Sequence, residues 1–274
     1  KPYWTTYPES VKIAGGKPVF LESDLTTDFK INIEQLEDAK TRKTKVLVWT
    51  SPSNPTGVVY TSKEAKEIYE WAFSNDIWIL SDELYEHFVY EGENTPSPAI
   101  LDTNLDNTII INGVSKAYSM TGWRVGWMIG NKEVINVAKK IQSHGASNVS
   151  NISQAAAESA LEHGLEETLR MKKAFNRRRL LAINILSKTK FISTNIPKGA
   201  FYIYPDVSEV LIGEKIKGIS SSYELCNWLL EELHIAFVPG EAFGTPGFIR
   251  CSYALGDEDL EEGLSRLSQA FENL

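Results

Sequence analysis

Polar side chains follow three predicted strands of this 274-residue sequence, at the points where the strands end. Asn54 comes after the apolar run KVLVWT, and Lys116 comes after TIII. Asp82 comes after IWIL, with Tyr85 three residues further along the chain. Because ligands of open α/β sheets collect outside the carboxyl ends of the strands, we expect this amide, carboxylate, phenol and amine to form one ligand-binding edge.

Each of these residues also has an ordinary structural explanation. Most lysines are solvated surface groups, an Asp in such a place commonly caps a helix or a turn, and an Asn beside prolines commonly shapes a loop. Four such residues at successive strand ends are harder to explain in this way, so the pattern favours a functional site. Arg124 follows Lys116 by eight residues, in an otherwise apolar segment.

Another arginine, Arg250, lies inside the predicted strand FIRCSY, where the sequence by itself favours a structural ion pair. A metal site is not expected, because the four histidines show neither HExxH nor HxH spacing. The two cysteines, Cys226 and Cys251, lack CxxC spacing and lie in apolar surroundings. We therefore expect them to be buried free thiols.

The elements that would position these residues alternate between buried strands and amphipathic helices. Strands are predicted at 18–23, 45–50, 77–80, 108–112 and 123–129, and helices at about 33–40, 62–75 and 132–143. Ser62 is the expected N-cap of its helix. This order indicates βαβ units, and hence a three-layer αβα fold around a mostly parallel sheet.

The pattern changes after a long helical stretch, from about 153 to 188, that only Gly164 interrupts. Short strands in AFYIYPD, IAFVPG and FIRCSY then alternate with helices near 221–233 and 257–272. We predict a large α/β domain over 1–164. A long connecting helix and a smaller α+β domain are predicted over 165–274.

Composition narrows the class of function. Apolar residues make up 42% of the chain, enough for a sizeable core. The formal net charge of −8 disfavours binding of nucleic acid, which needs a basic face. The sequence contains no run of 18 apolar residues and no signal segment, so we expect a soluble cytoplasmic protein that does not contact a membrane.

Together, NPTG, SDELYE, SKAYSMTGWRVGW and FIRCSY resemble the class I aminotransferases, which are pyridoxal-phosphate enzymes of the aspartate aminotransferase fold. PYWTTYPE and VPGEAFG resemble the same family, particularly its prokaryotic aspartate aminotransferase branch. The resemblance extends from residue 2 almost to the C-terminus. Because the chain starts without Met in a segment typical of a domain interior, we expect the N-terminal portion of the family, with its Gly-rich phosphate-binding turn, to be missing.

The resemblance implies that pyridoxal 5'-phosphate is the cofactor. Lys116 would form an imine with its aldehyde and later carry a proton, and Asp82 would keep its pyridine nitrogen protonated. Arg124 would bind its phosphate. Tyr85 and Asn54 would donate hydrogen bonds to its phenolic oxygen.

Three further roles follow from the same resemblance. Ser115 would add a hydroxyl to the cofactor site, although a small residue in a tight turn explains it equally well. Trp4 would stack on the cofactor ring. Arg250 would bind the α-carboxylate of the substrate as a planar fork, with Trp4 and Asn54 beside it.

The implied function is an amino-acid aminotransferase that works by a ping-pong cycle on amino acids and 2-oxo acids, with aspartate and 2-oxoglutarate preferred. Prephenate, alanine, aromatic or kynurenine aminotransferases, or a lyase, are alternatives on the same scaffold. A non-catalytic aminotransferase-like ligand-binding domain of a transcription regulator is the alternative from another class, which the acidic charge disfavours. Family members are dimers with shared active sites, so a homodimer is expected.

Overall fold

The computed structural model describes residues 1–92 and 94–274, and they form two compact units. The sheet unit comprises Asn32–Pro52 and Val59–Lys172. The mixed unit comprises Lys1–Ile31, Ser53–Val58 and Lys173–Leu274. These units place the N-terminal 31 residues and the loop 53–58 with the C-terminal part, whereas the predicted domains were 1–164 and 165–274.

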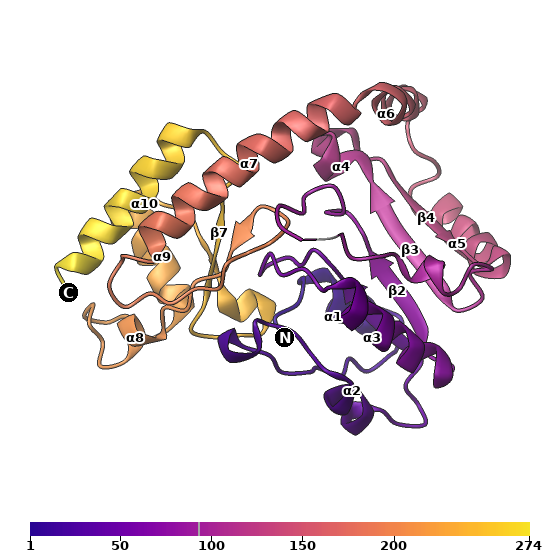
Figure 1. Cartoon of the computed structure of the whole chain (residues 1–274), viewed down its shortest axis with the longest axis horizontal. Helices are drawn as coiled ribbons and strands as arrows, with labels where there is room; N and C mark the ends of the chain where they lie inside the picture. Colours follow the sequence, from indigo (N-terminus) through magenta and orange to yellow (C-terminus); the bar gives the residue numbers. More distant parts are fainter. Residues whose placement is uncertain (93) are drawn as a thin grey trace. The chain divides into compact units, whose positions relative to one another are not determined.

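A four-stranded sheet organises the sheet unit (Figure 1). Its strands, in spatial order, are β1 (Val46–Thr50), β2 (Trp78–Asp82), β3 (Thr108–Gly113) and β4 (Gly126–Gly130). The first three strands are parallel, and β4 runs antiparallel to β3. The prediction of a mostly parallel α/β sheet is therefore confirmed.

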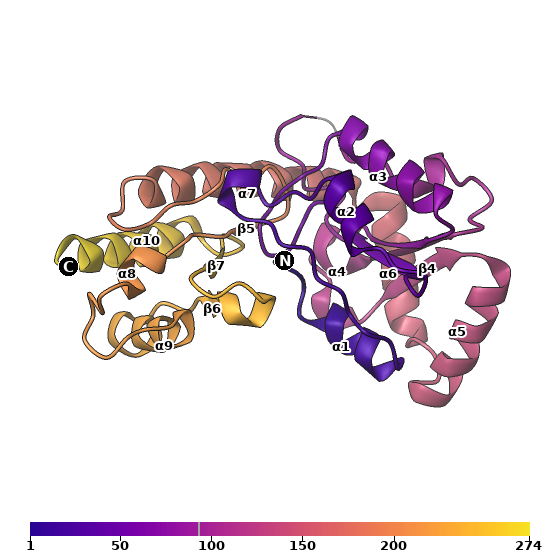
Figure 2. The same cartoon turned by 90° about the horizontal axis from the view of Figure 1, so that it is seen from below.

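Helices flank this sheet. They are α2 (Ile33–Ala39), α3 (Ser62–Ser74), α4 (Val114–Ala117), α5 (Lys132–Gly145) and α6 (Asn151–His163). Figure 2 shows α2 and α3 together on one side of the sheet, and α5 toward the other. Among the residues that the structure describes, no helix combines the length and the apolar character needed to cross a bilayer.

Helix α3 shows how the local sequence determines an element. Its buried residues recur with helical spacing, so one apolar stripe packs inward. The N-cap is Thr61, and the prediction of Ser62 is wrong by one residue. Thr61 Oγ1 accepts a hydrogen bond from Glu64 N (3.2 Å), and the Glu64 carboxylate accepts one from Thr61 N (2.7 Å). This reciprocal capping box requires Thr61 outside the helix.

The strand predicted at 18–23 is not formed, because the segment joins no ladder. Its apolar side chains Val19 and Phe20 are exposed. The strand predicted at 123–129 begins only at Gly126. Arg124 has left-handed backbone angles (φ 57°, ψ 46°), which interrupt an extended chain.

The mixed unit contains a small antiparallel sheet in the order β5-β7-β6, surrounded by helices. Its elements are α1 (Thr6–Ile13), β5 (Tyr202–Ile203), α8 (Ser208–Leu211), α9 (Ser222–Leu233), β6 (Val238–Pro239), β7 (Ile249–Ser252) and α10 (Asp257–Glu272). Helix α7 (Leu165–Leu186) begins in the sheet unit and ends in the mixed unit.

Three separate chain segments build the core of the mixed unit. Phe29, Val58, Tyr204 and Phe243 form one buried cluster. Tyr204 packs edge-on against both Phe29 and Phe243, with ring centroids 5.8 Å apart in each case. The N-terminal segment and the loop 53–58 are therefore structural parts of this unit.

Cys226 and Cys251 are buried free thiols in the mixed unit, as predicted. Burial raises the pKa of each thiol to about 12. Since the thiolate is the reactive form, neither cysteine has the character of a nucleophile.

Candidate functional site

The carboxyl edge of the four-stranded sheet carries Asp82 and Lys116. Asp82 is the last residue of β2 and is level with Thr50 of β1 and Ile111 of β3. Its Oδ1 accepts a hydrogen bond from Leu84 N (3.2 Å), so the carboxylate also shapes the turn that follows. Lys116 lies in α4, the short helix directly after β3. Both side chains are half-buried.

Strand β4 brings Arg124 to the same edge. Gly113, the last residue of β3, pairs with Gly126, and Val114 N donates to Val125 O (3.3 Å). A Cβ on Gly113 would lie 2.9 Å from Val125 O, so the close approach of the two strands requires glycine. Arg124 is exposed, and its Nη1 donates to Thr121 O (2.9 Å).

Two hydroxyl groups complete this edge. Tyr85 lies in the turn after β2, and its side chain is buried. Ser115 precedes Lys116 in α4 and is half-buried. The structure thus places an amine, a carboxylate, a guanidinium and two hydroxyls along one edge of one sheet.

Glu83 is an additional titratable group at this edge that the sequence did not indicate. Burial raises the pKa of its carboxyl group, and the neighbouring charges of Glu86 and Asp82 act in the same direction. The hydroxyl of Ser81 opposes the shift by donating to Glu83 Oε1 (2.9 Å). Glu83 therefore holds its proton more tightly than an ordinary glutamate.

The mixed unit surrounds Arg250 with aromatic rings. Its Cζ lies 4.5 Å from the ring centroid of Tyr202, 5.0 Å from that of Phe243 and 5.9 Å from that of Trp4. Its Nη1 donates to Asn54 Oδ1 (2.9 Å). Its Nε is buried and has no hydrogen-bond partner within residues 1–92 and 94–274.

This environment does not contain the ion pair that the sequence favoured. No carboxylate among the described residues pairs with Arg250, and its described hydrogen bond goes to a neutral amide. A buried donor without an acceptor costs about 1–3 kcal/mol. An added carboxylate that accepts from Nε would remove this penalty, so the geometry suits a carboxylate ligand.

Tyr202 and Phe243 were not identified from the sequence as site residues. The alternation in FYIY places Tyr202, in β5, and Tyr204, just after it, on the same side of the chain. Tyr202 is paired with Ser252, two residues after Arg250 in β7. Recognising that FYIY pairs with FIRCSY would have found Tyr202, whereas no pairing pattern indicates Phe243.

Trp4 and Asn54 belong to the mixed unit, although Asn54 was expected at the edge of the large sheet. The segment Ser53–Val58 leaves β1 and makes its contacts with residues from the C-terminal part. Its turn is closed by bonds from Gly57 N to Ser53 O (2.9 Å) and from Ser53 N to Val58 O (2.9 Å). The meeting of Asn54 with Asp82 and Lys116 remains a prediction.

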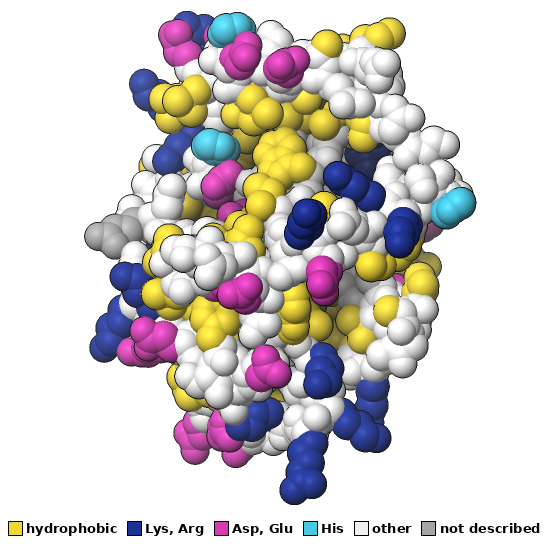
Figure 3. All heavy atoms as spheres, turned by 90° about the vertical axis from the view of Figure 1, so that its right-hand side faces the viewer, with side chains coloured by type: hydrophobic (Ala, Val, Ile, Leu, Met, Phe, Trp, Pro, Cys, Tyr) yellow, Lys and Arg dark blue, Asp and Glu magenta, His cyan; other side chains and the backbone are white. Residues whose placement is uncertain are grey.

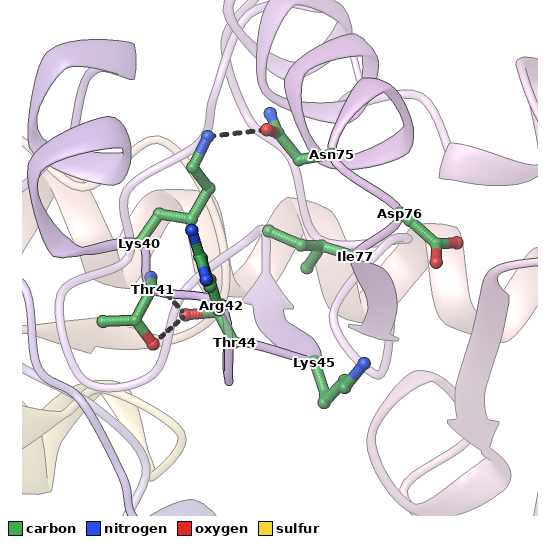
Figure 4. Close-up of a pocket in the computed structure, with 8 residues that line it drawn as sticks. All are labelled: Lys40, Thr41, Arg42, Thr44, Lys45, Asn75, Asp76 and Ile77. Carbon is green, nitrogen blue, oxygen red and sulfur yellow. Dashed lines mark hydrogen bonds between the residues drawn. The ribbon is translucent and has the colours of Figure 1, made fainter.

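A cavity of about 250 Å³ in the sheet unit lies at the opposite edge (Figure 4). Its lining includes Lys45 and Ile77, which directly precede β1 and β2. Figure 4 shows the Lys40 amine directed at Asn75, whose Oδ1 accepts its hydrogen bond (2.6 Å). Because this cavity is at the amino ends of the strands, it is separate from the candidate site.

Comparison with known proteins connects these features to one family. Residues 1–267 match the family model described as aminotransferase class I and II. The chain is 50% identical to an aspartate aminotransferase of Streptomyces avermitilis, covering 98% of this chain and 66% of that protein. It is 42% identical to an aspartate aminotransferase of Bacillus sp. strain YM-2, covering 98% and 68%. The chain thus spans about two-thirds of the length of these relatives.

Solved structures agree in fold. An aromatic aminotransferase from Pyrococcus horikoshii has a TM-score of 0.92 and 35% identity, covering 100% of this chain and 72% of that one. The aspartate aminotransferase from Rhizobium meliloti has a TM-score of 0.91 and 38% identity, covering 99% and 69%. These comparisons confirm the predicted fold class and the predicted family. The chain belongs to the class I and II aminotransferase family.

Proposed function

We propose that this protein is a pyridoxal-phosphate-dependent aminotransferase that moves an amino group from aspartate to 2-oxoglutarate. The observation that carries the proposal is the guanidinium of Arg250, which lies among aromatic rings and has a buried donor with no acceptor in the described part of the chain. Amino acids and 2-oxo acids share the carboxylate that such a group selects. The preference for aspartate rests on the names of relatives that are 40–50% identical.

The donors at the carboxyl edge of the sheet fit pyridoxal phosphate chemically. When bound, the cofactor supplies an electron sink for the reacting amino acid. Lys116 would attach the cofactor aldehyde through its amine and, once released, move the proton at the substrate Cα. Asp82 would hold the proton on the pyridine nitrogen, and Arg124 would bind the phosphate. Ser115 and Tyr85 would add hydroxyl contacts.

In the same proposal, Trp4, Asn54 and Arg250 serve the substrate. Arg250 would bind and orient the α-carboxylate, and Asn54 would orient Arg250 through the bond to Oδ1. Trp4 would stack on the pyridine ring of the cofactor and also lie against the guanidinium of Arg250. Orientation of this kind lowers the barrier because the reacting groups are held near the geometry of reaction.

Prephenate is a second candidate amino acceptor. Relatives from Aquifex aeolicus (41% identical) and Cereibacter sphaeroides (42% identical) are named for aspartate and prephenate together, the former as probable. Assays of the full-length protein with aspartate and either acceptor distinguish the two. Turnover with prephenate at a kcat/KM similar to that with 2-oxoglutarate would establish the wider specificity.

We also propose a homodimer, with the surface around α5 among the regions covered by the partner. Ile129 of β4 and Val137 and Ile141 of α5 expose 45%, 55% and 69% of their surface. Figure 3, which faces this side, shows apolar side chains gathered at the surface. Clustered exposed apolar residues commonly mark an interface. A monomer in sedimentation of the full-length protein would contradict the dimer.

The attachment of the cofactor tests the proposed chemistry directly. Full-length protein with pyridoxal phosphate should absorb visible light, and borohydride should fix the cofactor covalently to one lysine. Peptide mass spectrometry should locate it at Lys116, and Lys116→Ala should abolish both signals. A single labelled lysine elsewhere, in the parent and in Lys116→Ala, would refute the assignment.

A further inference from the structure

We propose that Arg179 is a positioning residue for the substrate carboxylate, because it fixes the loop that holds Asn54 against Arg250. Arg179 lies on α7, and only 1% of its surface is exposed. Its Nη1 donates to Pro197 O (2.7 Å), and its Nε donates to Asn176 Oδ1 (3.0 Å). The inference rests on the proposed function, in which Arg250 binds the carboxylate.

The neighbouring arginines of α7 behave differently. Arg177 and Arg178 both donate to the carboxylate of Asp257, and the Arg177 side chain is 62% exposed. Two donors of the Arg179 guanidinium go to a backbone carbonyl and a side-chain amide. Burial of a cation is costly unless its donors are hydrogen-bonded. A buried planar fork held in this way can fix the backbone at Pro197.

The segment 195–199 in turn holds the loop 53–58. Lys198 N and Gly199 N both donate to Gly57 O, at 2.9 and 2.8 Å. Asn195 Nδ2 donates to Thr56 O (3.3 Å). Two consecutive carbonyls of the loop are therefore fixed by the segment that Arg179 supports.

Gly57 shows how little space separates the two segments. Its φ is +68°, and a Cβ at this position would lie 2.4 Å from Pro197 Cβ and 2.8 Å from Tyr202 O. A displacement of Pro197 would therefore be transmitted to Gly57. Asn54 is three residues earlier in the same turn, and its Oδ1 accepts the hydrogen bond of Arg250 Nη1 (2.9 Å).

These contacts form a continuous path from Arg179 through Pro197 and Gly57 to Asn54 and Arg250. A guanidinium that binds a carboxylate through two hydrogen bonds must be held within a few tenths of an ångström. Loss of the contacts that Arg179 makes should therefore weaken carboxylate binding by Arg250. Arg179→Lys tests this, because a lysine amine cannot donate to Pro197 O and Asn176 Oδ1 with the geometry of a fork.

The experiment measures binding of succinate, a dicarboxylate without an amino group, to the full-length cofactor-loaded protein by calorimetry. Arg179→Lys should raise Kd about tenfold, since a misplacement by a fraction of an ångström is costly for an oriented contact. Arg177→Lys is the matched control on the same helix, and its Kd should stay within about twofold because its ion pair is exposed.

A double-mutant cycle with Asn54 distinguishes a positioning role of Arg179 from a role in stability alone. If Arg179 acts through Asn54, Arg179→Lys should have little further effect on Kd in an Asn54→Ala background. Independent, additive effects on Kd would overturn the proposal. Thermal unfolding of each variant is measured in parallel, because a merely structural role lowers Tm and leaves the Kd of the folded protein unchanged.

Asn195→Ala provides a second test if Arg179→Lys does not fold. It removes the donor to Thr56 O and should weaken succinate binding in the same direction, with the same dependence on Asn54. Binding by Asn195→Ala that equals that of the parent would overturn the positioning path. Failure of the proposed function looks different: the parent would not bind succinate, or Arg250→Lys would bind it as well as the parent does.

Discussion

In the proposed site, Arg250 has the features expected of a binding arginine rather than of a structural one. Its guanidinium is surrounded by Trp4, Tyr202 and Phe243, and it donates to Asn54. Aromatic faces stabilise the cation without consuming its hydrogen-bond donors. The fork therefore stays available for a planar acceptor, which a surface ion pair would not allow.

Replacement by lysine tests this interpretation of Arg250. Arg250→Lys keeps the charge and loses the planar fork, so kcat/KM for aspartate should fall by about 10–100-fold. The reaction of a simple amine without a carboxylate should change little. Arg266→Lys, in an exposed pair with Glu262 on α10, serves as the control. Equal losses for aspartate and amine would indicate a folding or cofactor defect.

Glu83 gives a prediction for the pH dependence of stability. Its pKa is raised by burial, so its contribution to folding is fully present below the unfolded pKa of about 4.3 and is lost as pH rises through the folded value. Glu83→Gln cannot ionise and should be more stable than the parent at pH 7. This advantage should shrink as the pH is lowered toward 4.

Glu37 serves as the control for Glu83, because its pKa is shifted in the opposite direction. Hydrogen bonds from Lys40 and Trp71 lower the pKa of Glu37, so its contribution is present above the unfolded pKa and is lost as pH falls. Glu37→Gln should therefore be less stable than the parent at pH 7, with a difference that shrinks on acidification. Urea midpoints at pH 4 to 7 measure both variants. Glu83→Gln below the parent at pH 7 would refute the assignment.

At the scale of elements, the turn 53–58 depends on a glycine. Gly57→Ala would introduce strain at φ +68° and a Cβ 2.4 Å from Pro197 Cβ, so it should destabilise the protein by about 2–5 kcal/mol. Gly213 has a similar φ of +73° with no atom within 4 Å of the added Cβ. Gly213→Ala should cost only about 1 kcal/mol.

Urea unfolding of both glycine variants provides the measurement. The difference between them isolates the close approach to Pro197, because the backbone strain is common to both. Equal losses of stability would mean that the loop can move away from the segment 195–199, and that Gly57 is needed only for its φ.

Much of the element pattern could be predicted from the sequence. The strands at β1, β2 and β3 and the helices α3 and α10 follow from apolar runs and helical stripes, which are local signals. The segment 18–23 has the same composition as a strand, but no partner ladder is available to it. The left-handed turn at Arg124 is not visible locally, because few non-glycine residues adopt it.

The candidate site also combines residues that the local sequence indicates with residues that only tertiary packing brings together. Asp82 and Lys116 could be located from strand ends, because parallel strands present their carboxyl ends at one edge. The rings around Arg250 are less visible in the sequence: the family resemblance indicated Trp4, strand pairing could have indicated Tyr202, and no local pattern indicates Phe243. Such a cluster depends on tertiary packing that no periodicity records.

At the scale of the molecule, each unit is assembled from separate chain segments. The core of the mixed unit takes Phe29 and Val58 from the first part of the chain and Tyr204 and Phe243 from the last. A division of the chain at one point cannot yield this core.

A C-terminal fragment tests whether the core of the mixed unit needs the first part of the chain. Residues 165–274, the region predicted from the sequence as one domain with its connecting helix, lack Phe29 and Val58. The fragment should show helical far-ultraviolet dichroism without a cooperative thermal transition, because the exposed cluster cannot pack. The full-length protein should melt cooperatively under the same conditions. A sharp transition in the fragment would show that the C-terminal segment is self-sufficient.

The segmented core also sets an order of events during synthesis. Phe29 and Val58 leave the ribosome long before Tyr204 and Phe243 are made. At translation rates of about 5–20 residues per second, the early segments wait roughly 10–40 seconds for their partners. Their apolar side chains are exposed to chaperones and proteases throughout this interval. The yield of folded protein in the cell should therefore depend on translation speed between these segments.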